Sequence, residues 1–232
     1  MKNKVILITG ANKGIGLEIA RQSGKLGFYV VISGRDEKKL ASALALLKKD
    51  KIEAEYLVMD VSSVESIKNA VWIFARMDMK LDVLVNNAGV SLRGDNSLLT
   101  NNAGIIEETI TTNSLGPLNV TREFLGFMKT PGRIIMISSM GGSMTQPIGG
   151  WSPAYCTSKS FLNAITRHLA FELKGRNISV NAVNPGWVRT DMGGSSAPLS
   201  VGKGAETPVW LAAAAPQDLT GKFFSDNEEI PW

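Results

Sequence analysis

The stretch from Val5 to Gly16 constrains the fold more than any other part of the chain. Val5-Ile6-Leu7-Ile8 is a short apolar run, typical of a strand that is buried on both faces of a parallel sheet. Thr9-Gly10-Ala11-Asn12-Lys13-Gly14-Ile15-Gly16 follows, and then a helical pattern continues to about Leu26. Backbone N–H groups at such a turn attract a pyrophosphate, and glycine lets the backbone approach it closely. The G-x3-G-x-G spacing therefore predicts a phosphate-binding turn, although an ordinary tight turn is the alternative.

Apolar runs of strand length alternate with helical patterns along the rest of the chain. The expected strands are residues 5–8, 28–32, 54–59, 81–85, 133–137, 179–183 and 222–224. This alternation predicts an α/β fold, a doubly wound sheet of seven mostly or wholly parallel strands with helices on both faces. No linker divides the chain, so residues 1–232 are expected to form one domain. Its cofactor half would end at about residue 138, and its catalytic and substrate half would cover about 139–232.

Composition excludes several classes of function. The net charge of +4 comes without any Lys/Arg run, which argues against a nucleic-acid partner. With one cysteine, Cys156, no disulfide can form within the chain, and with one histidine, His168, a multi-histidine metal site is not expected. No apolar run has membrane-spanning length, and the early strand leaves no room for a signal peptide. A cytoplasmic protein without a membrane or metal partner is therefore expected.

The end of the second strand indicates the cofactor. In a nucleotide-binding βαβ unit, an acidic residue at this point suits the ribose hydroxyls of NAD, whereas an Arg suits a 2′-phosphate. Arg35 occupies this region, and Lys13 projects from the nearby glycine turn. These charges favour NADP(H). Asp36 keeps NAD(H) possible, but it could equally cap the next helix.

Polar residues also follow the later strands. Asp60 could meet an adenine amino group or cap a helix, and Asn86-Asn87-Ala88-Gly89 ends the fourth strand, where open α/β sheets bind ligands. Asn101-Asn102-Ala103-Gly104 repeats these four letters, but no strand precedes it and its flanks differ. We therefore interpret the second copy as a coincidence.

Tyr155 and Lys159 are four residues apart and would lie on one face of a helix expected over residues 154–173. An ammonium group beside a phenol favours the phenolate, so this Tyr could exchange a proton near neutral pH. Such pairs are common by chance on helix surfaces. The pair gains weight from the glycine turn and the polar strand ends, which would bring a cofactor and a hydrogen-bond donor to it.

In these features the sequence resembles the short-chain dehydrogenase/reductase family, in its compact, Rossmann-type form, and in particular the NADPH-dependent carbonyl reductases of that family. The markers appear in family order from Thr9 to Asp191: the glycine motif, Asp60, Asn86–Gly89, Asn113, the second serine of Ser138-Ser139, Tyr155-x-x-x-Lys159, Asn184-Pro185-Gly186 and Thr190.

The resemblance implies roles for four catalytic residues. Tyr155 would be the general acid in reduction, and Lys159 would lower its pKa and hold the nicotinamide ribose. Ser139 would hydrogen-bond the substrate carbonyl, and Asn113 would hold a water beside Lys159. Thr190 would bind the nicotinamide carboxamide. The full set of expected cofactor contacts is Gly10, Asn12, Lys13, Gly14, Ile15, Gly16, Arg35, Asp60, Val61, Asn87, Ala88, Gly89, Tyr155, Lys159, Pro185, Gly186, Val188 and Thr190.

Two apolar sets complete the predictions. Met140, Trp151, Trp187 and Met192 flank the site elements and could line a substrate pocket with Ser139 and Tyr155, or could be core residues. On the helix expected over 154–173, one apolar stripe (Leu162, Ile165, Leu169, Leu173) would face the core. A second stripe (Phe161, Ala164, His168, Phe171) would be buried too or would meet a second copy in a homodimer or homotetramer.

The combined prediction is an NADPH-dependent oxidoreductase that reduces an aldehyde or ketone to an alcohol by hydride transfer. A Ser and a Lys-supported Tyr can stabilise and protonate the oxygen without a histidine or a metal. Two alternatives remain: an NAD-dependent secondary-alcohol dehydrogenase, and a non-catalytic protein that senses NADPH.

Overall fold

The computed structural model describes residues 4–146 and 149–232, so the parts of the expected domain at 1–3 and 147–148 lie outside the described residues. One eight-stranded sheet runs through the described chain in the order β3-β2-β1-β4-β5-β6-β7-β8. Its strands are β1 (Val5–Ile8), β2 (Tyr29–Gly34), β3 (Ala54–Val58), β4 (Leu81–Asn86), β5 (Met128–Ile137), β6 (Ile178–Val183), β7 (Phe223–Ser225) and β8 (Glu228–Ile230). The doubly wound α/β class is thus confirmed.

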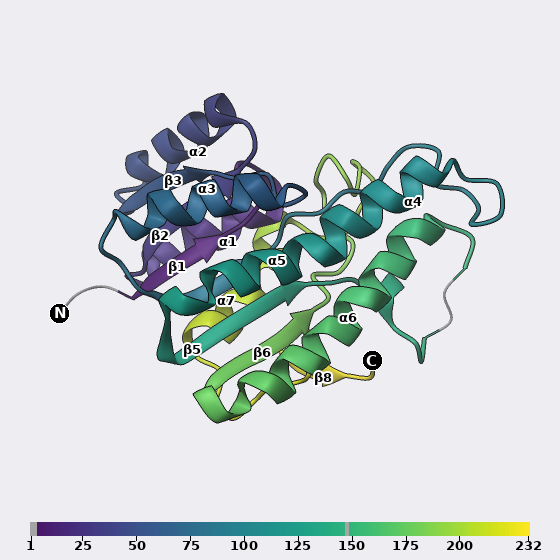
Figure 1. Cartoon of the computed structure of the whole chain (residues 1–232). Helices are drawn as coiled ribbons and strands as arrows, with labels where there is room; N and C mark the ends of the chain where they lie inside the picture. The colour runs from purple at the N-terminus through teal and green to yellow at the C-terminus, as the bar shows by residue number, and fades with distance from the viewer. Residues whose placement is uncertain (1–3, 147–148) are drawn as a thin grey trace.

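Helices cover both faces of this sheet (Figure 1). The main helices are α1 (Gly14–Lys25), α2 (Glu37–Lys49), α3 (Val64–Ala75), α4 (Ala103–Ile110), α5 (Gly116–Phe124), α6 (Pro153–Leu173) and α7 (Val201–Ala213). Short turns complete them: the π-helical η1 (Thr111–Leu115) and the 3₁₀ turns η2 (Leu125–Phe127), η3 (Met140–Gly142) and η4 (Lys174–Arg176). Two apolar cores result, one beneath α1, α2 and α7 and the other beneath α3, α5 and α6.

The strand count and the last strand differ from the prediction of seven strands. Strands β1 to β7 pair in parallel, but β8 is an eighth strand that pairs antiparallel with β7. The hairpin turns at Asp226 and Asn227, which both have positive φ (51° and 65°). Two-residue hairpins require this backbone conformation, and Asp and Asn adopt it more readily than most residues.

Helix α7 begins earlier than the pattern predicted. Residues 188–204 are rich in Gly, Ser and Pro, which is typical of a loop, and Thr207-Pro208 is typical of a helix start. The helix nevertheless starts at Val201, where the Ser200 side chain accepts a hydrogen bond from Lys203 N. Gly204 lies inside this helix, and a Cβ there would come within 2.6 Å of the Val188 side chain. Close packing, rather than loop flexibility, thus accounts for this glycine.

Candidate active site

The predicted site residues converge because parallel strands end at one edge of the sheet. The strand order reverses between β1 and β4, because β2 and β3 lie on one side of β1 and β4 lies on the other. Open α/β sheets bind ligands at such a switch point. Side chains tie these two strand ends together. The Thr9 hydroxyl accepts hydrogen bonds from Asn87 N and Ala88 N, both at 3.0 Å, and Asn87 Nδ2 donates to Thr9 O at 2.8 Å.

The glycine turn has the shape of a cradle for phosphate groups. Gly10 has φ +63°, and a Cβ there would lie 2.8 Å from the Cα of Ala88. A Cβ at Gly16 would lie 2.4 Å from Asn87 Nδ2. Helix α1 starts directly after this turn, and its N-cap residue, Lys13, makes no side-chain capping hydrogen bond. The open N–H groups and the positive end of the helix dipole fit an anionic dinucleotide.

The end of β2 is followed by a basic side chain and by an acidic one that is already engaged, and a second basic side chain projects from the glycine turn. Asp36 accepts a hydrogen bond from Lys39 N at 3.1 Å and caps α2, and this backbone hydrogen bond holds the pKa of Asp36 below its usual value. Arg35 is exposed beside it. Lys13 is exposed as well and forms an ion pair with Asp191. Of the two readings of Asp36, the structure therefore favours the helix cap, and the cationic residues suit a 2′-phosphate.

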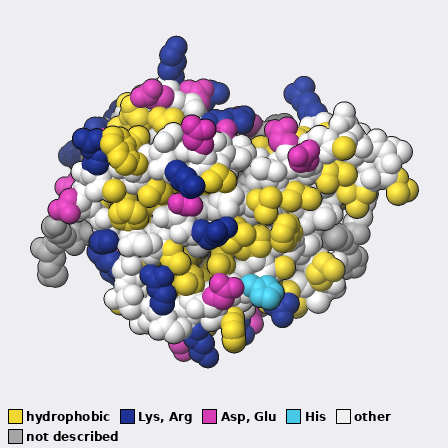
Figure 2. Space-filling view, viewed as in Figure 1, with side chains coloured by type: hydrophobic (Ala, Val, Ile, Leu, Met, Phe, Trp, Pro, Cys, Tyr) yellow, Lys and Arg dark blue, Asp and Glu magenta, His cyan; other side chains and the backbone are white. Residues whose placement is uncertain are grey.

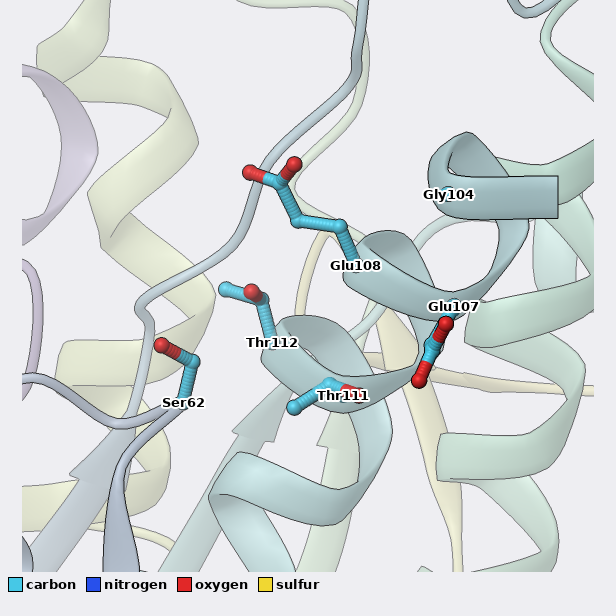
Figure 3. Close-up of a pocket in the computed structure, with 6 residues that line it drawn as sticks. All are labelled: Ser62, Gly104, Glu107, Glu108, Thr111 and Thr112. Carbon is cyan, nitrogen blue, oxygen red and sulfur yellow. The ribbon is translucent and has the colours of Figure 1, made fainter. Parts of the chain in front are cut away.

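The segment after β3 borders a shallow hollow of about 290 Å³ (Figure 3). Asp60 Oδ1 accepts hydrogen bonds from Ser62 N (2.9 Å) and Ser62 Oγ (2.7 Å), so its carboxylate shapes this turn. The cap of α3 comes instead from Ser63, which accepts from Ser66 N. Val61 is buried. Across the hollow, Glu108 and Thr112 come from α4 and η1, as Figure 3 shows.

Ser139 and Tyr155 meet where β5 ends beside the first turn of α6. Burial raises the pKa of the Tyr155 phenol to about 12, and the neighbouring Ser139 hydroxyl lowers it by a smaller amount. Lys159 Nζ lies 5.6 Å from the centre of the Tyr155 ring. Because its pKa is about 12, the phenol keeps its proton at neutral pH in the chain without a cofactor.

Lys159 is almost fully buried, and this burial lowers its pKa to about 8. Its Nζ donates a hydrogen bond to Ile137 O at 2.8 Å. A buried ammonium group has fewer water molecules around it and so interacts more strongly with nearby charge. In the chain, burial is the largest influence on the pKa of Tyr155 and raises it. The expected lowering of this pKa by the Lys159 charge remains a prediction.

Two glycines after Ser139 bring the strand end against α6. A Cβ at Gly141 would lie 2.8 Å from Cys156 Sγ, and a Cβ at Gly142 would lie 2.6 Å from the carbonyl carbon of Lys159. The backbone of η3 therefore lies directly on the helix. This contact places the segment that follows Ser139 against the helix that carries Tyr155 and Lys159.

Asn113 lies in the π-helical turn η1 and is fully buried. Its side chain holds the β4–α4 loop: Oδ1 accepts from Val90 N at 2.7 Å, and Nδ2 donates to Val90 O at 2.8 Å and to Ser158 Oγ at 3.0 Å. Both Asn113 and Lys159 lie against Gly89, whose added Cβ would be 3.2 Å from Asn113 Oδ1 and 3.5 Å from Lys159 Nζ. The expected neighbourhood of the two residues is present.

The four expected pocket residues are exposed, which rules out a core position for them. Met140, Trp151, Trp187 and Met192 each expose at least 37% of their surface. The Trp151 ring lies 5.9 Å from the Tyr155 ring, and Trp187 Nε1 donates to Gly193 O at 2.8 Å. Their apolar surfaces are thus available at the loops around the site.

The segment after β6 lies beside the glycine turn. A Cβ at Gly14 would lie 3.4 Å from Thr190 Cγ2, and Gly186 has φ +79° directly after Pro185. Val188 is buried, so its side chain packs against Gly204 and only its backbone can face a cofactor.

Sequence reasoning missed the supporting roles of three residues, although it had named one of them, Asn184, as part of the Asn-Pro-Gly marker. Asn184 Oδ1 accepts from Met140 N at 3.1 Å and links the ends of β5 and β6. Asn163 accepts from Ser138 Oγ at 2.6 Å and donates to Gly142 O at 3.0 Å. Asp95 binds the backbone of α6. Asn163 could have been recognised as a polar residue on the buried face of an otherwise apolar helix. Asp95 lies in a loop without a regular pattern, so the sequence offered no signal for it.

Within residues 4–146 and 149–232, no group of three or more His, Cys, Asp or Glu side chains is arranged to hold a metal ion. In the same residues no helix has both the length and the apolar character needed to cross a membrane.

Comparisons with known proteins point to one family. The family model described as short chain dehydrogenase matches residues 4–198. Carbonyl reductase [NADPH] 1 of Mus musculus is 32% identical over 274 aligned positions, covering 98% of each chain, and (+)-neomenthol dehydrogenase of Arabidopsis thaliana is 31% identical, covering 96% of each. The crystal structure of NADPH-bound carbonyl reductase from chicken fatty liver superposes with a TM-score of 0.90 at 26% identity, covering all of both chains.

The alignment with the mouse relative also shows a difference in length. It spans 274 positions, whereas this chain has only 232 residues. The relative therefore carries segments, more than forty positions in total, that have no counterpart in this chain.

Proposed function

This chain belongs to the short-chain dehydrogenase family, and from that premise we propose that it reduces an aldehyde or ketone to an alcohol with NADPH. The observation that carries the proposal is that Tyr155 neighbours both Ser139 and the buried Lys159, at the sheet edge that holds the glycine turn. The relatives named carbonyl reductase [NADPH] support the same reaction and cofactor.

Residues from four strand ends would hold the cofactor. The N–H groups at the start of α1 would bind the pyrophosphate, and Lys13 and Arg35 would bind the 2′-phosphate. Asn87, Gly89, Lys159 and Thr190 would lie along the nicotinamide half. When bound there, NADPH would supply the hydride.

The protein's own contribution is to stabilise and protonate the carbonyl oxygen. Negative charge develops on that oxygen during reduction, and donors placed at it lower the barrier. The Ser139 hydroxyl and the Tyr155 phenol would both donate to it, and the phenol would then release its proton to the oxygen. Because burial raises the pKa of Tyr155 to about 12, this proton is present at neutral pH before the reaction.

Lys159 would stabilise the phenolate that remains after this transfer, since its ammonium group lies near the ring. Asn113, held by Val90 and Ser158, would hold a water beside Lys159 and so connect Lys159 to a proton supply. Trp151, Trp187, Met140 and Met192 would line an apolar substrate pocket.

The test compares the wild type with Tyr155→Phe in NADPH-oxidation assays over a panel of aldehydes, ketones and quinones. The wild type should reduce some members, and Tyr155→Phe should lose at least about a hundredfold in kcat, because general acid catalysis contributes about 10²–10⁴-fold. NADPH should bind both proteins alike. The same assays with NADH should give a much lower kcat/KM than with NADPH.

Two outcomes would contradict the proposal. A wild type that binds NADPH but reduces nothing on the panel would favour a sensor of NADPH. A strong preference for NADH would favour an NAD-dependent alcohol dehydrogenase, and Arg35→Ala should then leave that preference unchanged.

A further inference from the structure

Helix α6, which carries Tyr155, has no N-terminal cap of its own. Ser152 occupies the N-cap position in the left-handed region (φ 37°), and its side chain makes no capping hydrogen bond. Pro153 has no N–H group, and Cys156 N already donates to Ser152 O at 2.9 Å. The N–H groups of Ala154 and Tyr155 are therefore the donors of the first turn that need an acceptor from elsewhere.

Asp95, from the loop between β4 and α4, supplies that acceptor. Its Oδ1 accepts from Ala154 N and its Oδ2 accepts from Tyr155 N, both at 3.0 Å. The side chain is buried, with 5% of the residue exposed. A single carboxylate thus satisfies both remaining donors of the first turn, and its charge lies at the positive end of the helix dipole.

Asn101 holds Asp95 in this position. Its Nδ2 donates to Asp95 Oδ1 at 2.7 Å, while its own Oδ1 accepts from the backbone N–H groups of Asn96 and Ser97 at 3.0 Å each. The neighbouring Asn102 does something different: it caps α4 by accepting from Gly104 N at 2.8 Å. The second Asn-Asn-Ala-Gly therefore has a structural role, which the first copy does not share.

Building on the proposed reduction, we propose that Asp95, oriented by Asn101, is a positioning residue for Tyr155. One of the two hydrogen bonds that it accepts from α6 comes from the backbone of Tyr155 itself, so it fixes where the phenol stands relative to Ser139. A general acid must lie within a fraction of an ångström of its working position, and a displacement of 1 Å can cost about a hundredfold in rate. By occupying the helix N-terminus, Asp95 also leaves the Ser139 and Tyr155 hydroxyls as the donors for the substrate oxygen.

The experiment measures kcat for the best carbonyl substrate, the Kd of NADPH and the melting temperature in the full-length chain. Asp95→Ala should lower kcat by about tenfold to a hundredfold while the Kd of NADPH stays within about twofold, because most of the proposed cofactor contacts lie on elements other than α6. Asp95→Asn keeps one acceptor oxygen and should recover part of the lost kcat. This graded recovery would not arise from general loosening of the fold.

A matched pair of substitutions guards against misfolding of the Asp95 variants. Asn101→Ala frees the Asp95 carboxylate without removing it and should lower kcat severalfold. Asn102→Ala removes the adjacent residue's hydrogen bond to Gly104 N, in which neither Asp95 nor the backbone of α6 takes part, and should keep the wild-type kcat.

Three results would overturn the inference. The first is Asp95→Ala with a lower melting temperature but a wild-type kcat, which would make the residue a stabilising cap only. The second is equal loss of kcat in Asn101→Ala and Asn102→Ala. The third is a wild type that reduces no carbonyl compound, which would overturn the proposed function along with this inference; in the first two cases the proposed function stands.

Discussion

The burial of Lys159 should make the reduction rate depend measurably on pH. Its pKa in the folded chain is lowered to about 8, from 10.5, because burial disfavours the charged form. The ammonium group is therefore present below about pH 8 and is lost above it. We expect kcat/KM for carbonyl reduction to fall as the pH rises through about 8, since the phenolate of Tyr155 then loses its stabilising charge.

The control for this prediction is Lys159→Arg, in which the guanidinium stays charged throughout the range. Whatever activity this variant retains should show no fall near pH 8. The measurement is kcat/KM at fixed ionic strength from about pH 6 to pH 10. Identical profiles for the two proteins would show that another group causes the fall.

At the scale of elements, the contact between η3 and α6 sets the distance between Ser139 and Tyr155. Gly142 allows this contact, because a Cβ there would lie 2.6 Å from the carbonyl carbon of Lys159 and 2.8 Å from its oxygen. Gly142→Ala should push the two elements apart, lower the unfolding free energy by about 1–3 kcal/mol and reduce kcat more than NADPH affinity. Chemical denaturation and steady-state kinetics measure the two effects.

Gly149→Ala is the matched control, because a Cβ at Gly149 would meet no atom within 4 Å among the described residues beyond its chain neighbours. It should leave both stability and kcat near their wild-type values. If Gly142→Ala behaved like Gly149→Ala, the close packing of η3 on α6 would not determine the geometry of the site.

At the scale of the whole molecule, the outer face of α6 points to self-association. Its inner stripe is buried as expected, but on the outer stripe Phe161 and Phe171 are 42% and 83% exposed. Ala164, Arg167, His168 and Phe171 line a depression of about 460 Å³ there. Figure 2 shows hydrophobic side chains gathered on this face over α5 and α6, around the single histidine. Simple burial within one chain is thus ruled out for Phe171.

We therefore expect a homodimer or homotetramer at micromolar concentration, since large exposed aromatic residues indicate an interface. Phe171→Glu should shift the protein toward the monomer in sedimentation experiments. Leu46→Glu, on α2 at the opposite face of the sheet, replaces a residue that is 47% exposed and should leave the assembly unchanged. A wild type that sediments as a monomer would contradict this expectation.

Local patterns predicted much of this protein correctly. The apolar runs placed the first six parallel strands, because strand and helix periodicities are properties of neighbouring residues. The i, i+4 spacing placed Tyr155 and Lys159 on one helix, and the glycine turn before α1 followed from its flanks. Since parallel strands end at one edge, the strand order then brought Ser139 to Tyr155.

Only the tertiary structure decided the features that depend on residues distant in the sequence. Asp95 caps a helix that begins 58 residues after it, and the ion pair of Lys13 joins it to Asp191, 178 residues away. Burial, which sets the pKa of Tyr155 and Lys159, also arises only when α6 packs on the sheet. Such contacts leave no periodic trace in the sequence, because loop geometry and not residue spacing brings the partners together.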